Sequence, residues 1–399
     1  MTVTDHDKHD TIDGTASAGT TAPAQQTPQD EAAQHEAPER ETAAQRGDAL
    51  AERLLGSLIG GIELLTIELG HRLGLYAALH SRGPATSAEL ARRAGITERY
   101  AREWLEQQAA AGFIDVAEDT GAATTRRFAL PAAHVGVLLD TDDPSYLIGA
   151  AQMLIGSALP LPAVADAYRT GRGVDYADYG AEMRHGIAAL NRPMVGADLA
   201  SWVATMPDVE ARLRSGGRIL DAGCGLGWST ITLARAFPQV RVHGIDLDPA
   251  SIDEARDNAA AAGVSDRVTF EVADAATMTA PGGARFDLAT VFEALHDMGE
   301  PIEALRQMRG VLAPDAPVLV GDERVSDEFT APAEEIERLQ YAFSVLHCLP
   351  ATMAESTAVA SGTVLRAPTV RRWAEQAGFS AVQILPIEND FWRFYRLNQ

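Results

Sequence analysis

The chain has 399 residues, of which 46% are apolar, so it is long enough for two folded domains with sizeable cores. Its formal net charge of −23 argues against a polyanion as the main partner. The sequence has no signal-peptide pattern, no apolar run long enough to cross a bilayer, and only two cysteines, Cys224 and Cys348. We therefore expect a cytoplasmic protein without membrane contact or a disulfide framework.

Residues 1–48 are predicted to form a disordered acidic tail. Thr, Ala, Gln and Pro dominate this segment, large apolar residues are almost absent, and ten acidic residues face three basic ones. Such a segment cannot bury enough apolar surface to offset its ordering entropy. A solvated extension is favoured over a regulatory or partner-binding tail.

Residues 49–133 show the pattern of a winged-helix domain, with three helices followed by a hairpin. The expected helices lie at 49–76, 86–95 and 97–109, and the expected strands at 112–116 and 126–130. Winged helices often bind DNA, but residues 50–130 hold nine arginines against ten acids. Because specific DNA binding usually needs a basic face, nucleic acid is not the expected partner.

Residues 134–216 are expected to form a helical connector, and residues 217–399 alternate strand and helix. The expected strands are 218–222, 240–245, 267–272, 286–291 and 316–321, with helices at 228–236, 250–262 and 301–310. This pattern predicts a doubly wound parallel sheet. An insertion, 322–365, in which a helix is expected over 333–346, is suitably placed to be a substrate lid. A last helix then leads into an antiparallel hairpin at 381–385 and 391–396.

A glycine turn follows the first of these strands, at Gly223, Gly225 and Gly227. The dinucleotide pattern G-x-G-x-x-G is not met, because its third position falls on Trp228. The next strand ends in an acid, Asp246, which can accept hydrogen bonds from ribose hydroxyls. Asp274 ends the third strand and is placed to receive an adenine amino group. These residues predict a nucleoside site without a phosphate-binding signature.

Five motifs make residues 217–397 resemble a class I S-adenosylmethionine-dependent methyltransferase, with a seven-stranded Rossmann-like sheet. They are D-A-G-C-G-L-G (221–227), G-I-D-L-D-P (244–249), V-A-D-A (272–275), F-D-L-A-T-V-F-E-A-L-H-D (286–297) and A-G-F (377–379). The resemblance implies S-adenosylmethionine as cofactor. It assigns cofactor contacts to Asp221, Gly223, Cys224, Gly225, Asp246, Leu247, Asp274, Ala275 and Phe292.

The preceding module resembles the N-terminal domain of small-molecule O-methyltransferases, which implies a homodimer and a small-molecule methyl acceptor. In that family the connector passes over the cofactor and contributes aromatic and amide side chains. The matching candidates for substrate contact are Tyr176, Tyr179, Asn191, Met194 and His347. Ordinary packing between domains explains these residues equally well.

His296 is the candidate general base, because it follows the fourth strand in a stretch that resembles the Leu-His-Asp-Trp of the same family. Met298 stands where that family has tryptophan, and a packing role for His296 is the alternative. Glu293 could orient the base or contact the substrate. No cluster has metal-ligand spacing, so no metal is expected.

The leading interpretation is methylation of a small molecule, most readily on oxygen, although nitrogen and carbon acceptors remain open. The alternative is a winged-helix transcriptional regulator whose methyltransferase-like domain senses the cofactor without catalysis.

Overall fold

The computed structural model describes residues 42–279, 281–283 and 285–399. The chain divides into two units, residues 1–54 and 55–399, and the boundary falls inside helix α1 (Ala43–Arg72). Most of the predicted acidic tail lies outside the described residues. Its last six positions, from Ala43 onwards, are helical, so α1 begins earlier than the apolar pattern indicated.

The winged-helix pattern is present in the structure. Its elements after α1 are α2 (Leu75–Arg82), α3 (Ser87–Ala94), α4 (Glu98–Ala110), and the antiparallel pair β1 (Asp115–Glu118) and β2 (Arg127–Ala129). Thr86 and Glu89 form a capping box at the start of α3. The core of this region contains Tyr76 and Trp104, whose rings meet edge to face at 5.0 Å.

Helices form the connector. They are α5 (Val135–Leu138), α6 (Ile148–Ala158), α7 (Leu161–Thr170), α8 (Gly180–Ala204) and α9 (Pro207–Arg214), with a 3₁₀ turn at Tyr176–Tyr179. Within the described part of the chain, no single helix is long and apolar enough to cross a membrane. One helix pair, α6 and α7, meets the length and composition test together, but it is bent by 54°.

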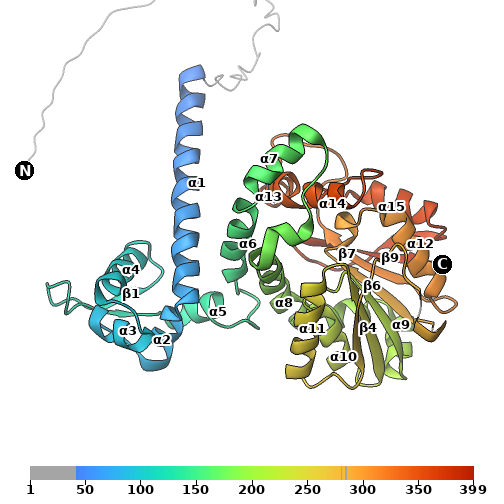
Figure 1. The fold of residues 1–399 in the computed structure, drawn as a ribbon, viewed down its shortest axis with the longest axis horizontal. Coiled ribbons are helices and arrows are strands. Elements are labelled where there is room, and N and C mark those ends of the chain that lie inside the picture. Colours follow the sequence, from blue (N-terminus) through green and yellow to red (C-terminus); the bar gives the residue numbers. More distant parts are fainter. Residues whose placement is uncertain (1–41, 280, 284) are drawn as a thin grey trace, which may run out of the picture. The chain divides into compact units, whose positions relative to one another are not determined.

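A seven-stranded sheet follows, in the order β5-β4-β3-β6-β7-β9-β8 (Figure 1). Its parallel strands are β3 (Gly217–Ala222), β4 (Val240–Asp246), β5 (Val268–Val272), β6 (Leu288–Phe292) and β7 (Val318–Glu323). The predicted hairpin is present as β8 (Ala381–Ile384) and β9 (Trp392–Asn398), and β9 pairs antiparallel with β7. Chain order reverses between β3 and β6, and ligands of such sheets bind beside this reversal at the carboxyl ends of the strands.

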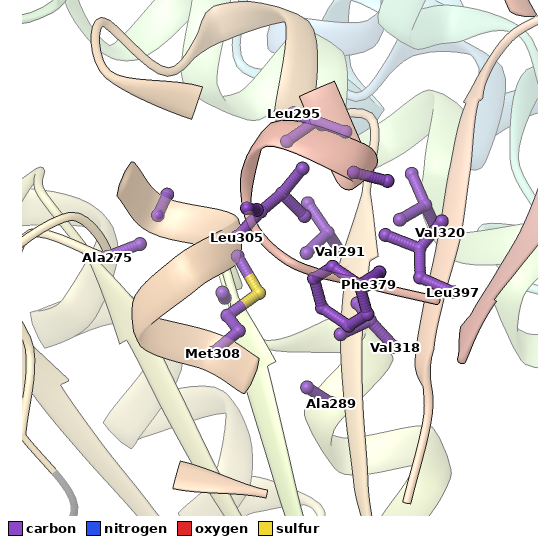
Figure 2. Close-up of a cluster of buried hydrophobic side chains, with 14 of the residues drawn as sticks. Ala275, Ala289, Val291, Leu295, Leu305, Met308, Val318, Val320, Phe379 and Leu397 are labelled. Carbon is purple, nitrogen blue, oxygen red and sulfur yellow. The ribbon is translucent and has the colours of Figure 1, made fainter. Parts of the chain in front are cut away.

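Helices cover both faces of the sheet, because consecutive strand residues point to opposite sides. On β7, Val318 and Val320 join the cluster against α12 (Pro301–Val311) and α15 (Ala367–Gln376), part of which Figure 2 shows. Leu319 joins the opposite cluster, which α8, α9, α10 (Trp228–Ala236) and α11 (Pro249–Ala261) help to form. Both faces are therefore apolar, and polar side chains concentrate at the strand ends.

The predicted insertion contains α13 (Glu335–Phe343), a π-helical turn at Ser344–Cys348, and α14 (Leu349–Glu355). The sequence pattern predicted one helix over 333–346. The structure continues the helical chain to Glu355 through the π turn, which places Glu355 at the cavity described below.

Candidate functional site

A cavity of about 310 Å³ lies at the carboxyl ends of β3, β4, β5 and β6. Its size is at the lower end of the range for small-molecule sites. Eleven of the predicted site residues line it. They are Tyr176, Asn191, Gly223, Cys224, Gly225, Asp246, Leu247, Asp274, Ala275, Phe292 and Glu293. Five predicted residues are not among its lining: Tyr179, Met194, Asp221, His296 and His347.

The glycine turn forms one wall of the cavity with bare backbone. Gly223 and Gly225 have φ angles of 71° and 49°, in the left-handed region that favours glycine. A Cβ atom at Gly223 would collide with the side chain of Ala294. Replacement of Gly223 by any other residue would therefore strain the backbone and displace the chain that follows β6.

Backbone amides hold Asp246 in place. The N–H of Gly225 donates to its Oδ2 at 2.8 Å, and the N–H of Asp248 donates to its Oδ1 at 2.9 Å. Burial raises the pKa of Asp246, and these two hydrogen bonds oppose the shift. Each oxygen keeps accepting capacity, because a carboxylate oxygen has two lone pairs. Asp246 can therefore accept from a diol in the cavity while it fixes the glycine turn.

Asp221 does not line the cavity, and its carboxylate supports the turn from below. Oδ2 accepts from the hydroxyls of Ser229 and Thr230, each at 2.6 Å, and Oδ1 accepts from Thr290 at 2.7 Å. The side chain thereby ties the start of α10 to the neighbouring strand β6. The motif around Asp221 is in the expected place, but this side chain contacts protein hydroxyls.

The cavity wall is strongly acidic. Its carboxyl groups belong to Asp246, Asp248, Asp274, Glu293, Asp297, Glu300 and Glu355, and Arg184 is the one lysine or arginine in the described lining. Burial raises the pKa of Glu355 to about 7, and the charges of Asp297 and Asp274 add to this shift. Such a wall favours a positively charged ligand.

His296 lies behind the cavity wall, and only 1% of it is exposed. Its Nδ1 is 2.9 Å from Oδ1 of Asp322, and its Nε2 is 3.3 Å from Oδ1 of Asp297. Burial alone would lower the pKa of this imidazole, but the two carboxylates raise it well above its ordinary value. The two carboxylates therefore favour the imidazolium form of His296, and its role as base stays a prediction.

Glu293 lies in the cavity wall, where His296 was expected as the general base. It follows β6 directly and lines the cavity, and its Oε2 accepts a hydrogen bond from Nδ2 of Asn191, on α8. Burial raises the pKa of Glu293, and the Asn191 hydrogen bond opposes this shift. A carboxyl group with a raised pKa at a cavity wall is a candidate for proton transfer.

Aromatic rings form another part of the wall. Phe292 and Trp392 both line the cavity, and their rings are stacked with centroids 5.9 Å apart and planes at 7°. Trp228 lines it as well, with the guanidinium of Arg192 at 4.0 Å from its ring centroid. The sequence analysis did not predict Trp392, because no motif in the C-terminal hairpin indicates that this strand lies near the glycine turn.

Three of the five predicted substrate residues stand outside the cavity lining. Tyr179 is fully buried and donates its hydroxyl to the carbonyl of Leu346 at 2.8 Å. His347 is buried against Tyr179 and Tyr176, at 4.5 and 5.7 Å between ring centroids. Met194 packs near Asn389. Only Tyr176 and Asn191 reach the cavity, and His347 packs between the rings of Tyr176 and Tyr179.

His296, Asp297 and Cys348 form the one group of possible metal ligands in the described part of the chain, with donor atoms within 4.8 Å of one another. The sequence did not predict this group, because Cys348 lies in the insertion, far along the chain from His296 and Asp297. Both ring nitrogens of His296 already have a carboxylate partner, Asp297 or Asp322, so the hydrogen-bonding capacity of the ring is satisfied without a metal ion. The expectation that no metal is needed stays a prediction.

Comparison with known proteins places two domains in the chain. Residues 213–367 match the family described as "Methyltransferase domain", and residues 61–139 match the "Rv2258c-like winged HTH domain". The chain is 41% identical over 110 residues to 27-O-demethylrifamycin SV methyltransferase of Amycolatopsis mediterranei (strain S699), which covers 28% of the chain and 40% of that enzyme. The chain thus spans less than half the length of this relative.

Solved structures share the fold over most of the chain. The mitomycin 7-O-methyltransferase MmcR aligns with a TM-score of 0.62 at 18% identity, over 89% of this chain and 99% of its own. Human N-acetylserotonin methyltransferase, solved in complex with S-adenosylmethionine, aligns with a TM-score of 0.63 at 16% identity, over 88% of this chain and 97% of its own. At these identities the likeness shows the fold alone.

Proposed function

We infer that this chain, which carries an S-adenosylmethionine-dependent methyltransferase domain behind a winged helix-turn-helix domain, methylates a small molecule on oxygen. The acidic cavity beside the glycine turn carries this inference, since it combines bare backbone, a fixed Asp246 and a wall that suits a cation. The names of the rifamycin and mitomycin enzymes support oxygen as the acceptor atom.

The residues of the cavity fit S-adenosylmethionine. Asp246 would accept from the ribose hydroxyls, Asp274 would receive the adenine amino group, and the turn at Gly223–Gly225 would contact the cofactor through backbone. The remaining predicted contacts are those of Cys224, Leu247, Ala275 and Phe292. When bound, the cofactor supplies an electrophilic methyl group on a positively charged sulfur.

The protein's own contribution is to position the acceptor and to receive its proton. Phe292 and Trp392 offer flat apolar surfaces that suit an aromatic or other planar acceptor. Two residues are candidates for the base, His296 and Glu293. Glu293 lines the cavity, whereas His296 would first have to give up the proton that Asp297 and Asp322 stabilise.

We propose that the protein acts as a homodimer in the cytoplasm, with α1 in the dimer interface. The apolar side chains of α1 that are 40–61% exposed support the dimer, and the two cysteines, both free, support the reducing compartment. A DNA-binding regulator is less well supported, because both arginines of α4, Arg99 and Arg102, lie within 4 Å of glutamates one turn away.

The test is calorimetric titration with S-adenosylmethionine, S-adenosylhomocysteine and, as control, NAD. Binding of the first two without NAD would support a nucleoside site for this cofactor, and absence of all binding would reject it. A panel of phenols and alcohols is then incubated with the cofactor, and methylated products are detected by mass spectrometry. Glu293→Gln and His296→Gln are assayed in parallel, and the variant that loses about 10²-fold in turnover with cofactor affinity retained identifies the base.

A further inference from the structure

Two glutamates meet where β6 and β7 end side by side. The parallel pairing sets Phe292 opposite Gly321, and the N–H of Glu293 donates to the carbonyl of Gly321 at 2.8 Å. Glu293 follows β6, Glu323 is the last residue of β7, and their buried carboxyl groups are near enough to act on each other. Glu323 is 3% exposed and does not line the cavity, whereas Glu293 does.

A hydrogen bond between two carboxyl groups requires a proton on one of them, because a carboxylate can only accept. Two ionised carboxylates in contact without water would repel each other strongly. The amides around the pair fit a single shared proton. Asn191 of α8 donates to Oε2 of Glu293, and Gln340 of α13 donates to Oε2 of Glu323. Each glutamate thus has an amide donor of its own in addition to its partner.

The backbone of Glu293 is also unusual. Its φ angle is 49°, in the left-handed region, where a residue with a long side chain is rare and strained. Such strain persists where the surroundings enforce it and is frequent at functional sites. Here the strained residue is the one member of the pair that lines the cavity.

We propose that Glu293 and Glu323 share one proton and form the proton-accepting group of the cavity. Glu293 is the member that meets the acceptor, and Glu323 is a positioning residue that holds the shared proton. This assignment rests on the proposed function and deepens it. It involves two residues, Glu323 and Gln340, that no sequence motif singled out.

The direction of the pKa shifts agrees with this division. Burial and the charge of Glu293 raise the pKa of Glu323 well above its ordinary value, and a hydrogen bond between the two favours the ionised form of Glu293. The other charged groups that face the pair are the imidazolium of His296, which favours ionisation of both, and Asp297 and Asp322, which oppose it.

In the proposed step, Glu293 receives the proton of the acceptor during methyl transfer. The O–H bond of the acceptor breaks and its proton passes to the carboxylate of Glu293, while the acceptor oxygen forms a bond to the methyl carbon. The electron pair of the sulfur–methyl bond stays on sulfur, so one positive and one negative charge disappear together. Proton loss to water then restores the singly charged pair.

The first test is infrared spectroscopy of the full chain in ²H₂O, which detects protonated carboxyl groups. The spectra are recorded in the Glu355→Gln background, because Glu355, with its pKa raised to about 7, would add a protonated carboxyl band of its own at pH 7. In this background a protonated carboxyl band is expected that weakens when Glu323→Gln is added. Added Glu337→Gln is the control, because Glu337 is a buried glutamate outside both the cavity and the pair. An unchanged band after addition of Glu323→Gln would overturn the shared proton.

The second test asks whether the pair responds to a charge in the cavity. Protons released on binding are measured by calorimetry in buffers of different ionisation enthalpy, with S-adenosylmethionine and with S-adenosylhomocysteine, which lacks the positive charge on sulfur. The cation is expected to release more protons than the analogue in Glu355→Gln and in Glu355→Gln/Glu337→Gln, where Glu355 no longer contributes, and the excess is expected to vanish in Glu355→Gln/Glu323→Gln.

An equal excess in all three proteins would remove the pair from the cavity's proton chemistry. If no protein binds either compound, the proposed function fails, and the infrared result still decides whether the proton is shared.

Discussion

At the scale of single residues, the same type of side chain serves different purposes according to the groups around it. Asp221 and Asp246 lie at the ends of the neighbouring strands β3 and β4. Asp221 is buried and accepts from three protein hydroxyls, whereas Asp246 receives one backbone N–H on each oxygen and faces the cavity. The position of each carboxylate relative to the cavity therefore determines which aspartate is available to a ligand.

The first prediction concerns Asp246. Replacement by alanine is expected to weaken the binding of S-adenosylmethionine by about 1–3 kcal/mol, because ribose hydroxyls lose their acceptor. Calorimetric titration measures the change. Asp253→Ala is the control, since the side chain of Asp253 is 77% exposed on α11 and outside the cavity. Equal affinities for the wild type and the Asp246→Ala variant would remove Asp246 from the site.

The second prediction concerns His296 and stability. His296→Ala is expected to lower the free energy of unfolding by about 3–5 kcal/mol, because Asp322 is left buried without its cationic partner. Urea unfolding measures the loss, and the double variant His296→Ala/Asp322→Asn should recover part of it. Full stability with reduced turnover would instead favour His296 as the catalytic base.

The sign of the pH dependence follows from the raised pKa of His296. Its contribution to stability is complete below the unfolded value of about 6.5 and is lost as the pH rises through the higher folded value. The difference in unfolding free energy between wild type and His296→Ala should therefore shrink on the alkaline side.

A third prediction concerns Glu355, whose pKa is raised to about 7 by burial and by its acidic neighbours. A cation binds more tightly when this group is ionised, so affinity for S-adenosylmethionine should rise as the pH increases through 7. Calorimetry at several pH values tests this. The Glu355→Gln variant should show a weaker dependence, and an unchanged profile would assign the effect to another group.

At the scale of elements, helix α1 stands out because its apolar side chains are exposed. Within residues 55–72 they are Leu55, Leu58, Ile59, Ile62, Leu65 and Leu69. Their spacing of one, three and four residues places them along one side of the helix. A stripe of this length is typical of an interface between proteins, and the proposed homodimer would cover it.

The fourth prediction tests this helix. Leu58→Glu combined with Ile62→Glu is expected to convert a dimer into a monomer, because two charges would be buried in an apolar interface. Light scattering after size-exclusion chromatography measures the mass. Leu159→Glu is the control, since Leu159 is 65% exposed in the turn between α6 and α7. A monomeric wild type, or a variant that stays dimeric, would contradict an interface at α1.

The insertion between β7 and β8 is the second element with a functional consequence. It contributes Glu355 to the cavity wall, Gln340 to the glutamate pair and Cys348 to the group around His296. That the insertion forms a substrate lid stays a prediction. The π turn at Ser344–Cys348 joins its two helices, and such turns are frequent at functional sites.

The fifth prediction follows for hydrogen exchange. Binding of S-adenosylmethionine is expected to slow amide exchange in α14, because Glu355 at its end lines the cavity. Exchange in α4, whose residues do not line the cavity, serves as the internal reference, and NAD serves as the ligand control. Protection that is equal in α4 and α14 would indicate a general effect on the chain.

At the scale of the whole molecule, local patterns predicted the architecture correctly. The seven-stranded sheet, its C-terminal hairpin and the preceding winged-helix region are all present, because strand alternation, helical periodicity and caps are properties of short segments. The helix bounds differ by a few residues, and α1 starts earlier than the apolar pattern, since polar residues can continue a helix that has already begun.

The sequence by itself also predicted residues that line the cavity at the glycine turn and at Asp246. The glycines have φ angles that other residues avoid, and Asp246 ends the next strand, so one strand–helix–strand unit of the chain contains the whole pattern. The group proposed to accept the proton depends on tertiary structure. Glu293, Glu323, Asn191 and Gln340 come from four separate parts of the chain, and only sheet pairing and helix packing bring them together. That is why sequence reasoning favoured His296 as the base, while the folded chain places Glu293 in the cavity wall and His296 behind it.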